Sequence, residues 1–337
     1  MSKSIVRNGA IDSIAGVLIL HMMLIHIQQF VNSDTRFYYY QNLVLSFFMP
    51  WFFFKSGMFF STKEPCQVFK STLKKLILPF CIYAILGEFI YYMICLVECK
   101  EYNICLVFLR FIAHGSSNGN LPLWFLLSLF FVRNIINYLT FKGISGNKLI
   151  CIFLIASLVV FPIYSNCKYI PWYIGNTLIG SLFYLLGFNF KHLQKINIYI
   201  SLSSYAIMII FIPSLVNFFK CQIIYGYGIC WLLSSWLGIV SINNIFQNVA
   251  LLRYNKFLVY LGRHSMQFYS MHWIILIIFV PLIKTQFSNL PDVLFVLLLI
   301  LLCLIMIPII SFFMQNYAKI SRIAKNELFM SFSPQQR

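Results

Sequence analysis

Ten apolar runs, separated by short polar connections, dominate this sequence. A helix that crosses a bilayer needs about 20 mostly apolar residues, and each run comes close to that length. The pattern therefore predicts an all-α fold, a polytopic integral membrane bundle of about ten transmembrane helices. The expected spans are 9–31, 43–61, 76–97, 121–140, 148–165, 172–190, 197–219, 227–247, 266–283 and 292–315.

The composition agrees with lipid as the solvent for most of the chain. Hydrophobic residues make up 61% of the sequence and charged residues only 10%, whereas soluble domains carry about 25% charged residues. The 337 residues accommodate one bundle and leave no room for a second soluble domain, so we expect a single domain over 1–337. The first run is too long for a signal-peptide core, and we expect it to be retained as the first span.

The basic residues predict the orientation of the bundle. With a cytoplasmic N-terminus and ten spans, 18 of the 25 Lys and Arg residues lie in inner segments, six lie in outer segments, and Lys55 lies within a span. Cytoplasmic loops of membrane proteins carry such an excess, so both termini are expected in the cytoplasm. The net charge of +17 is explained by these loops, and nucleic acid is not an expected partner.

Two features of the loops and spans favour structural interpretations. The ten cysteines form no CxxC pair and lie mostly inside apolar runs, which is typical of small packing residues, and no metal site is expected. Cys99 and Cys105 fall in an expected outer loop, where a pairing between them stays open. The segment 101–115 is too short and too polar for a span, so we expect an interfacial or re-entrant helix there.

Ionisable residues inside spans are costly and usually face a bundle interior or a wet cavity. Asp12 and His26 lie 14 residues apart in the first run, which places them on nearly the same helix face, about 21 Å apart along the axis. That distance excludes an ion pair and allows a shared cavity wall. A histidine titrating near neutral pH is suited to act as a general base. The alternative is a histidine that bonds a neighbouring helix.

Four further charged residues each allow two interpretations. Lys55, in the aromatic stretch 47–60, indicates either an anion-binding cavity or a side chain that extends to the membrane surface. Glu88 is a partner for Lys55 or for a histidine. Lys74 and Lys75 lie in the inner loop directly before the third run, where they suit a phosphorylated donor or are ordinary positive-inside charges.

Five motifs in chain order resemble the membrane acyltransferase-3 family, and in particular its branch of bacterial sugar and polysaccharide O-acetyltransferases. In the first motif, Asp12, Gly16 and His26 match that family's first span in register. In the last, Gly262, Ser265, Tyr269 and His272 match its late pattern. The motifs are RNGAIDSIAGVLILHMMLIH (7–26), MPWFFFKSGMFF (49–60), KKLILPF (74–80), LPLWFLLSLFF (121–131) and YLGRHSMQFYSMH (260–272).

The resemblance implies an acyltransferase of the bacterial inner membrane. The expected donor is acetyl-CoA, and the expected acceptor is a hydroxyl group of a cell-surface glycan or of a lipid-linked sugar. His26 would serve as general base or as a transient acyl carrier. The other expected site residues are Lys74, Lys75 and Lys55 for the donor, and Asp12, Glu88, Arg263 and His272 for the substrate cavity.

Two other functions remain open from the sequence. A flippase or transporter of lipid-linked glycans requires a basic path through the bundle, and Lys and Arg are sparse in the spans. A membrane polymerase or glycosyltransferase usually requires a large polar outer loop, and the longest one here, 98–120, is modest.

Overall fold

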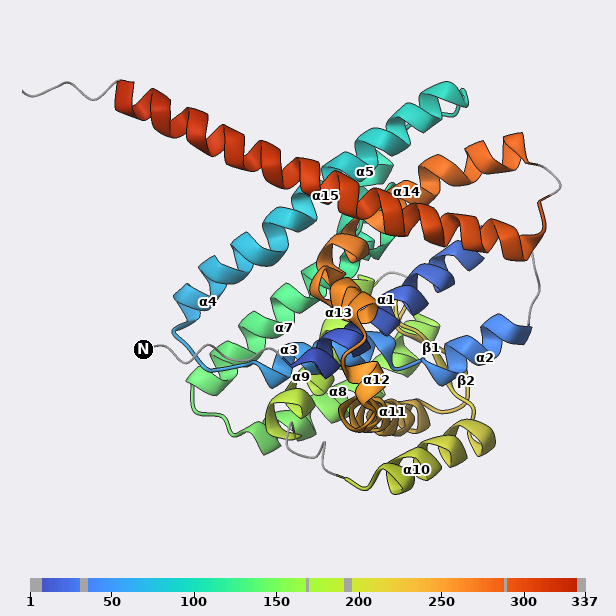
Figure 1. The fold of residues 1–337 in the computed structure, drawn as a ribbon. Coiled ribbons are helices and arrows are strands. Elements are labelled where there is room, and N and C mark those ends of the chain that lie inside the picture. The colour runs from blue at the N-terminus through green and yellow to red at the C-terminus, as the bar shows by residue number, and fades with distance from the viewer. Residues whose placement is uncertain (1–7, 31–35, 168–169, 191–195, 288–289, 332–337) are drawn as a thin grey trace, which may run out of the picture.

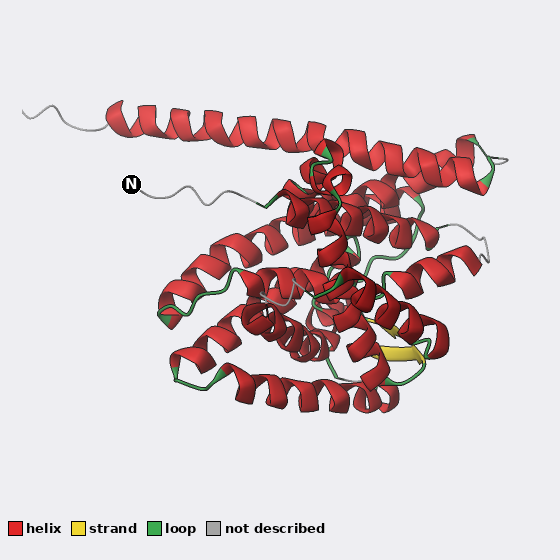
Figure 2. Cartoon of the chain, turned by 60° about the horizontal axis from the view of Figure 1, so that its bottom comes forward, coloured by secondary structure: helices red, strands yellow, loops and turns green. Residues whose placement is uncertain are grey.

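The computed structural model describes residues 8–30, 36–167, 170–190, 196–287 and 290–331. Within these ranges the chain is almost entirely helical, apart from one two-stranded antiparallel sheet (Figures 1 and 2). The helices are α1 (Gly9–Gln28), α2 (Arg36–Val44), α3 (Phe48–Met58), α4 (Pro65–Thr72), α5 (Leu78–Val97), α6 (Ile104–His114), α7 (Trp124–Phe141), α8 (Gly146–Asn166), α9 (Trp172–Phe190), α10 (Ile198–Phe211), α11 (Gly228–Asn248), α12 (Ala250–Arg253), α13 (Lys256–Arg263), α14 (Ser265–Gln286) and α15 (Asp292–Ser331).

Seven helical stretches of the described chain are long and apolar enough to cross a membrane, which confirms an all-α multi-pass membrane protein. One of them joins α4 and α5 through a π-helical turn at Leu73–Ile77. The stretches are Gly9–Gln28, Pro65–Val97, Leu121–Phe141, Gly146–Asn166, Gly228–Asn248, Ser265–Gln286 and Asp292–Met314. The other three of the ten expected spans differ in length or polarity.

The expected span 43–61 is not one helix. The chain turns at residues 45–47 and resumes as α3, which has only 11 residues. Pro50 lies in the first turn of α3 and has no N–H to bond the carbonyl of Ser46, so a helix cannot continue through this point without losing that hydrogen bond.

The expected span 197–219 is also wrong at its second half. Helix α10 ends at Phe211, two residues before Pro213, which disfavours a helical conformation in the residue before it. The chain then forms an antiparallel hairpin from β1 (Leu215–Asn217) and β2 (Gln222–Tyr225). This hairpin is the small sheet in Figure 2.

The expected span 172–190 is present as α9, which has 19 residues but is not among the seven most apolar stretches. It packs between α3, α7 and α8, and a helix surrounded by protein needs less apolar surface than one that faces lipid. Helix α6 occupies the expected interfacial segment, and none of its residues is buried. Cys99 and Cys105 are both free and exposed.

Helix α1 lies at the centre of the bundle and packs most extensively against α13. Their backbones approach closely because two glycines lie at the contact. A Cβ atom on Gly262 would lie 1.7 Å from the carbonyl oxygen of Asp12, and one on Gly16 would lie 2.2 Å from that of Leu258. Any larger residue would force the helices apart. Helix α15 packs on α14 and α1 and continues beyond the rest of the bundle (Figure 1).

Candidate functional site

Two histidines from opposite ends of the sequence meet inside the bundle. His26 near the end of α1 and His272 in α14 approach to 2.7 Å between Nδ1 of His26 and Nε2 of His272. His272 is fully buried, and its Nδ1 lies 2.9 Å from the carbonyl oxygen of Phe268, one helical turn earlier. Trp273 presents its ring edge-on to His26, with ring centroids 5.3 Å apart. His26 is thus fixed by two neighbouring residues of α14.

His26 opens into a cavity of about 270 Å³, which we call the His26 cavity. The hairpin forms much of its wall, because residues 215–219 and Ile224 line it. No Lys, Arg, Asp or Glu is among its described lining residues. Its polar lining side chains are His26, Gln29, Asn42, Ser46, Trp124, Asn217 and Tyr269.

The hairpin is held against the bundle by buried contacts near its turn. Cys221 is buried and places its sulfur 2.6 Å from Oδ1 of Asn176 in α9. Burial raises the pKa of the Cys221 thiol well above its usual value, so the group stays a neutral donor to the amide oxygen. Phe219, which lines the cavity, lies edge-on to Trp172 with ring centroids 4.8 Å apart.

His114 at the end of α6 completes the aromatic cluster outside the cavity. Its ring lies parallel to that of Trp172, with centroids 4.0 Å apart, and also contacts Phe219. Burial lowers the pKa of His114, and the nearby charges of Arg110 and Lys220 lower it further. The imidazole is therefore neutral near pH 7, which suits its stacked position.

A second cavity of about 160 Å³, the Lys55 cavity, adjoins the first. Met49 and Tyr269 line both cavities and so form their common wall. The Tyr269 hydroxyl is buried and donates no hydrogen bond to any described residue. Lys55 lies over the Trp51 ring, with Nζ 5.4 Å from the centroid. Apart from Lys55, the described lining is uncharged.

A third cavity of about 330 Å³, the Arg133 cavity, gathers positive charge. Lys63, Lys75 and Arg133 line it, and no Asp or Glu is among its described lining residues. Lys75 reaches it from the π-helical turn that precedes α5. The adjacent Lys74 is exposed and is absent from the described lining, so the structure separates the two lysines that the sequence paired.

The three cavities follow one another along the same two helices. On the α3 segment, Met49 lines the His26 cavity, Lys55 the second cavity and Phe59 the third. On α7 the order is Trp124, Phe125 with Leu129, and then Arg133. Arg133 follows Trp124 by nine residues, which is about 14 Å along the helix. We call this ordered series the chain of cavities: the His26 and Lys55 cavities share a wall, whereas the Arg133 cavity shares no described lining residue with either of them.

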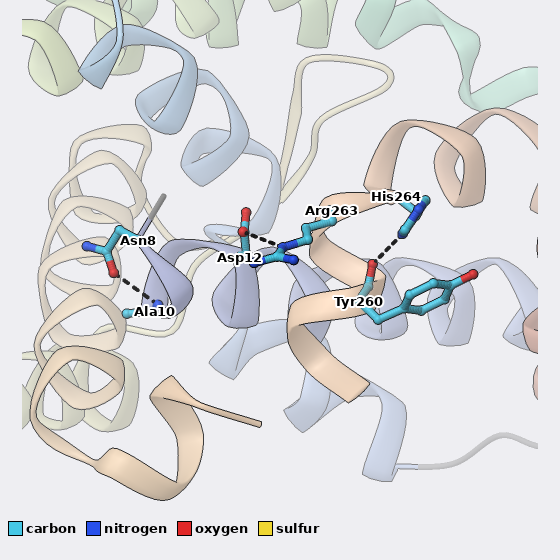
Figure 3. A network of polar contacts seen from close by, with 6 residues as sticks. All are labelled: Asn8, Ala10, Asp12, Tyr260, Arg263 and His264. Atoms are coloured by element: carbon cyan, nitrogen blue, oxygen red, sulfur yellow. Dashed lines mark hydrogen bonds and ion pairs between the residues drawn. The ribbon is translucent and has the colours of Figure 1, made fainter. Parts of the chain in front are cut away.

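Asp12 and Arg263 form a pair at the far end of α1 from His26. Nε of Arg263 lies 3.4 Å from Oδ2 of Asp12, and Figure 3 shows the pair beside the helix start that Asn8 caps. Asp12 is buried, whereas the Arg263 side chain is half exposed. Neither residue is among the described residues that line the three cavities. The pair joins α1 to α13 at the close glycine contact.

Glu88 holds a loop in place. Its carboxylate accepts hydrogen bonds from the backbone N–H of Asn118 and, at 3.3 Å, from the hydroxyl of Tyr102. In the same loop, Asn120 donates to the carbonyl oxygen of Ser270 in α14 at 2.8 Å. Glu88 and Asn120 together fasten the segment before α7 against α5 and α14. The two hydrogen bonds to Glu88 come from Asn118 and Tyr102, and not from Lys55 or from either histidine of the pair.

Several residues of the site were missed from the sequence. Tyr269 belongs to the late motif but was not assigned to the site, and Arg133 was not assigned to it either. The hairpin residues were missed because 197–219 was read as one helix. Pro213 and the glycines at 226 and 228 were the available signals of a turn. Among the described residues, no group of three His, Cys, Asp or Glu side chains could hold a metal ion.

These features define a class of protein: a multi-pass membrane protein whose bundle encloses a histidine at the end of a chain of cavities. The chain belongs to the acyltransferase-3 family, because the sequence model of that family, described as an acyltransferase domain, matches residues 8–314. The resemblance read from the five motifs is thereby confirmed at the level of the family, and the protein is a membrane acyltransferase. No curated protein and no solved structure matches the chain.

Proposed function

We propose that this acyltransferase moves an acetyl group from acetyl-CoA to a hydroxyl group of a cell-surface glycan or lipid-linked sugar. The observation that carries the proposal is the order of the three cavities along α3 and α7, from a cationic cavity to His26. A donor with a charged head and a long neutral arm fits that order.

The donor would bind with its phosphates in the Arg133 cavity. Lys63, Lys75 and Arg133 supply positive charge there without a competing carboxylate among the described lining residues, and such clusters attract phosphorylated ligands. The pantetheine arm of coenzyme A is uncharged and flexible, and it suits the narrower Lys55 cavity. The thioester would then lie near the wall between the second cavity and His26.

The acceptor would occupy the His26 cavity. Its lining combines the side-chain amides of Gln29, Asn42 and Asn217 with the ring of Trp124. Amides both donate and accept hydrogen bonds, as hydroxyl groups do. Aromatic rings pack against the C–H faces of sugars, which are apolar. The absence of charged lining side chains among the described residues favours an uncharged sugar unit at this position.

The transfer requires a base and a group that stabilises the developing oxyanion. His26 would take the proton from the acceptor hydroxyl at Nε2, and the resulting alkoxide would attack the thioester carbonyl. The C–S bond then breaks, and the departing thiolate takes the proton from His26. Tyr269, whose buried hydroxyl donates no hydrogen bond to any described residue, would donate to the carbonyl oxygen as negative charge develops there.

The orientation of the protein follows from the same assignment. Acetyl-CoA is a cytoplasmic metabolite, so the Arg133 cavity would open to the cytoplasm. The N-terminus and the C-terminus would share that side, in agreement with the excess of Lys and Arg in the expected inner segments. The His26 cavity would face the opposite half of the membrane, where surface glycans are assembled.

The test is acetyl transfer from labelled acetyl-CoA into glycan, in membranes that hold wild-type or His26→Ala protein at matched levels. We expect transfer by the wild type and a loss of at least about 1,000-fold in the variant, since general-base catalysis and acceptor positioning are lost together. Transfer by both proteins at equal rates would remove His26 from the chemistry. A deletion strain with unacetylated glycan at the surface would support the proposal, whereas glycan retained inside the cell would indicate a flippase instead.

A further inference from the structure

We propose that His272 is a positioning residue that fixes the tautomer of His26, so that Nε2 of His26 carries the lone pair that faces the acceptor. This inference rests on the proposed function of His26 as the base. The tautomer, that is, which ring nitrogen of His26 is protonated, can be measured in the resting protein before any substrate is bound.

The backbone carbonyl group of Phe268 determines which nitrogen of His272 carries the proton. Nδ1 of His272 lies 2.9 Å from the backbone oxygen of Phe268. A carbonyl oxygen accepts hydrogen bonds and never donates them, so Nδ1 of His272 carries the proton. In a neutral imidazole the other nitrogen then has a lone pair. Nε2 of His272 is therefore an acceptor.

The contact between the two histidine rings then determines the tautomer of His26. Nε2 of His272 lies 2.7 Å from Nδ1 of His26. Since the former is an acceptor, Nδ1 of His26 must be the donor, and its other nitrogen, Nε2, must be unprotonated. The opposite assignment would set a lone pair of His272 against the lone pairs of the Phe268 carbonyl. Because His272 and Phe268 are both fully buried, such an unpaired contact would be costly.

The orientation of the rings supports a directed hydrogen bond. Their planes differ by only 10°, and their centroids lie 4.9 Å apart. That separation is close to the distance between the two nitrogens plus the two ring radii, so the rings lie side by side in nearly one plane. Imidazole N–H bonds and lone pairs also lie in the ring plane. The donor and the acceptor therefore point directly at each other.

The consequence for catalysis is a base that is correctly protonated before the acceptor arrives. With Nδ1 committed to His272, Nε2 is the nitrogen of His26 left for the cavity that His26 lines. When Nε2 takes the acceptor proton, the positive charge on His26 strengthens the bond from Nδ1 to His272. The same logic governs catalytic histidines oriented by a carboxylate. Here a neutral imidazole performs that task.

The chain offers a matched control in His264. Its Nδ1 also lies 2.9 Å from the carbonyl oxygen one helical turn earlier, that of Tyr260 (Figure 3). His264 therefore shares the backbone contact of His272. It lies near the Asp12–Arg263 pair (Figure 3), and Asp12 is in the first turn of α1 whereas His26 is in its last turn. Substitutions at His264 reproduce the loss of a helix-bonded histidine without disturbing His26.

The direct test is nitrogen NMR of the full-length protein in lipid bilayers, with ¹⁵N-labelled histidine and His26→Gln and His272→Gln samples to assign the signals. We expect His26 and His272 each to show a protonated Nδ1 and an unprotonated Nε2. In His272→Leu, which offers no acceptor, we expect His26 to lose that single tautomer. A wild-type His26 protonated at Nε2 would overturn the inference, whatever the activity of the protein.

The kinetic test compares His272→Gln, His272→Leu and the same two substitutions at His264. The Gln side chain places an acceptor oxygen near the position of Nε2, so His272→Gln should retain transfer within about tenfold of wild type. His272→Leu should lose about 100-fold in kcat with KM for acetyl-CoA changed less than about twofold, since the base is misprotonated. Both His264 variants should match wild type. Thermal unfolding of each variant identifies any that fails to fold.

The two readouts separate this inference from the proposed function. The expected tautomer in a protein that transfers no acetyl group would contradict the proposed reaction and leave the positioning of His26 intact. If His272→Leu kept the wild-type kcat while His26→Ala was inactive, His26 would remain the base and the positioning role of His272 would be overturned.

Discussion

The two ends of the chain of cavities are built differently. At one end His26 is bonded to a fully buried histidine, contacts Trp273 and lies under a hairpin anchored through a buried cysteine. At the other end Lys63 and Lys75 are exposed, and Arg133 is only half buried. The first end has fixed geometry and uncharged surroundings, whereas the second has positive charges on long, exposed side chains.

The difference agrees with what each end would be required to do. Proton transfer demands a base held within hydrogen-bonding distance of a reacting hydroxyl, and small displacements are costly. Phosphate binding by lysines tolerates several geometries, because an ammonium group acts as a compact point charge on a flexible stem. Substitutions at the His26 end should therefore lower kcat, and those at the Arg133 end should raise KM for the donor.

The largest remaining effect should come from Tyr269→Phe, at the wall between the first two cavities. The substitution keeps the ring and removes the hydroxyl that would stabilise the oxyanion. Loss of one such donor costs about 100-fold in kcat. Steady-state kinetics of acetyl transfer would measure it, with KM for acetyl-CoA expected to stay within about twofold.

The matched control is Tyr260→Phe, at a tyrosine that does not line the three cavities as described. It should leave both constants unchanged. If Tyr269→Phe raised KM for acetyl-CoA and left kcat unchanged, the hydroxyl would bind the donor and not stabilise the oxyanion. The expectation that substitutions near His26 lower kcat would then be wrong for Tyr269.

A smaller effect is expected at the cationic end from Lys75→Gln combined with Arg133→Gln. Removing two cations should raise KM for acetyl-CoA about tenfold or more, since a hydrogen bond to a charged group contributes about 1.5 kcal/mol or more. The value of kcat at saturating donor should change little. Acetyl-pantetheine, which lacks the nucleotide phosphates, should be used equally well by the variant and the wild type.

The neighbouring Lys74 supplies the control for this pair. It carries the same charge one residue away but is absent from the described lining of the Arg133 cavity. Lys74→Gln should therefore leave KM for acetyl-CoA within about twofold of wild type. An equal rise in KM from Lys74→Gln would show that general positive charge, and not the cavity, attracts the donor.

Much of the fold follows from apolar length alone. Seven of the ten expected spans coincide with helices long and apolar enough to cross a bilayer. Of the remaining three, two are interrupted by prolines that the hydropathy pattern hides, and one depends on its neighbours. Pro50 and Pro213 interrupt apolar stretches whose hydropathy is otherwise uniform, and α9 tolerates polar residues because protein surrounds it.

The site was only partly accessible from the sequence, for a physical reason. His26 follows from an ionisable residue in an apolar helix, but its partner lies 246 residues away, and no local pattern encodes that contact. For the same reason Asp12 and Arg263 were grouped with the cavity, whereas the structure pairs them at the opposite end of α1. Spacing along one helix gives the face of a residue, and the partners depend on how other helices pack.

The smallest expected effect concerns the hairpin that covers the His26 end, through His114. The pKa of His114 is lowered in the folded protein from its ordinary value of 6.5, with burial the largest cause. The unfolded chain therefore binds the proton more readily, so the stability contributed by neutral His114 is present above about pH 6.5 and is lost as the pH falls. His114→Phe keeps a ring against Trp172 and removes the titration. Between roughly pH 7.5 and 5.5 the unfolding temperature should fall less in this variant than in wild type, by about 1–2 °C, because the site is half exposed. Identical pH dependence in the two proteins would show that burial of His114 beside Trp172 contributes no pH-dependent stability.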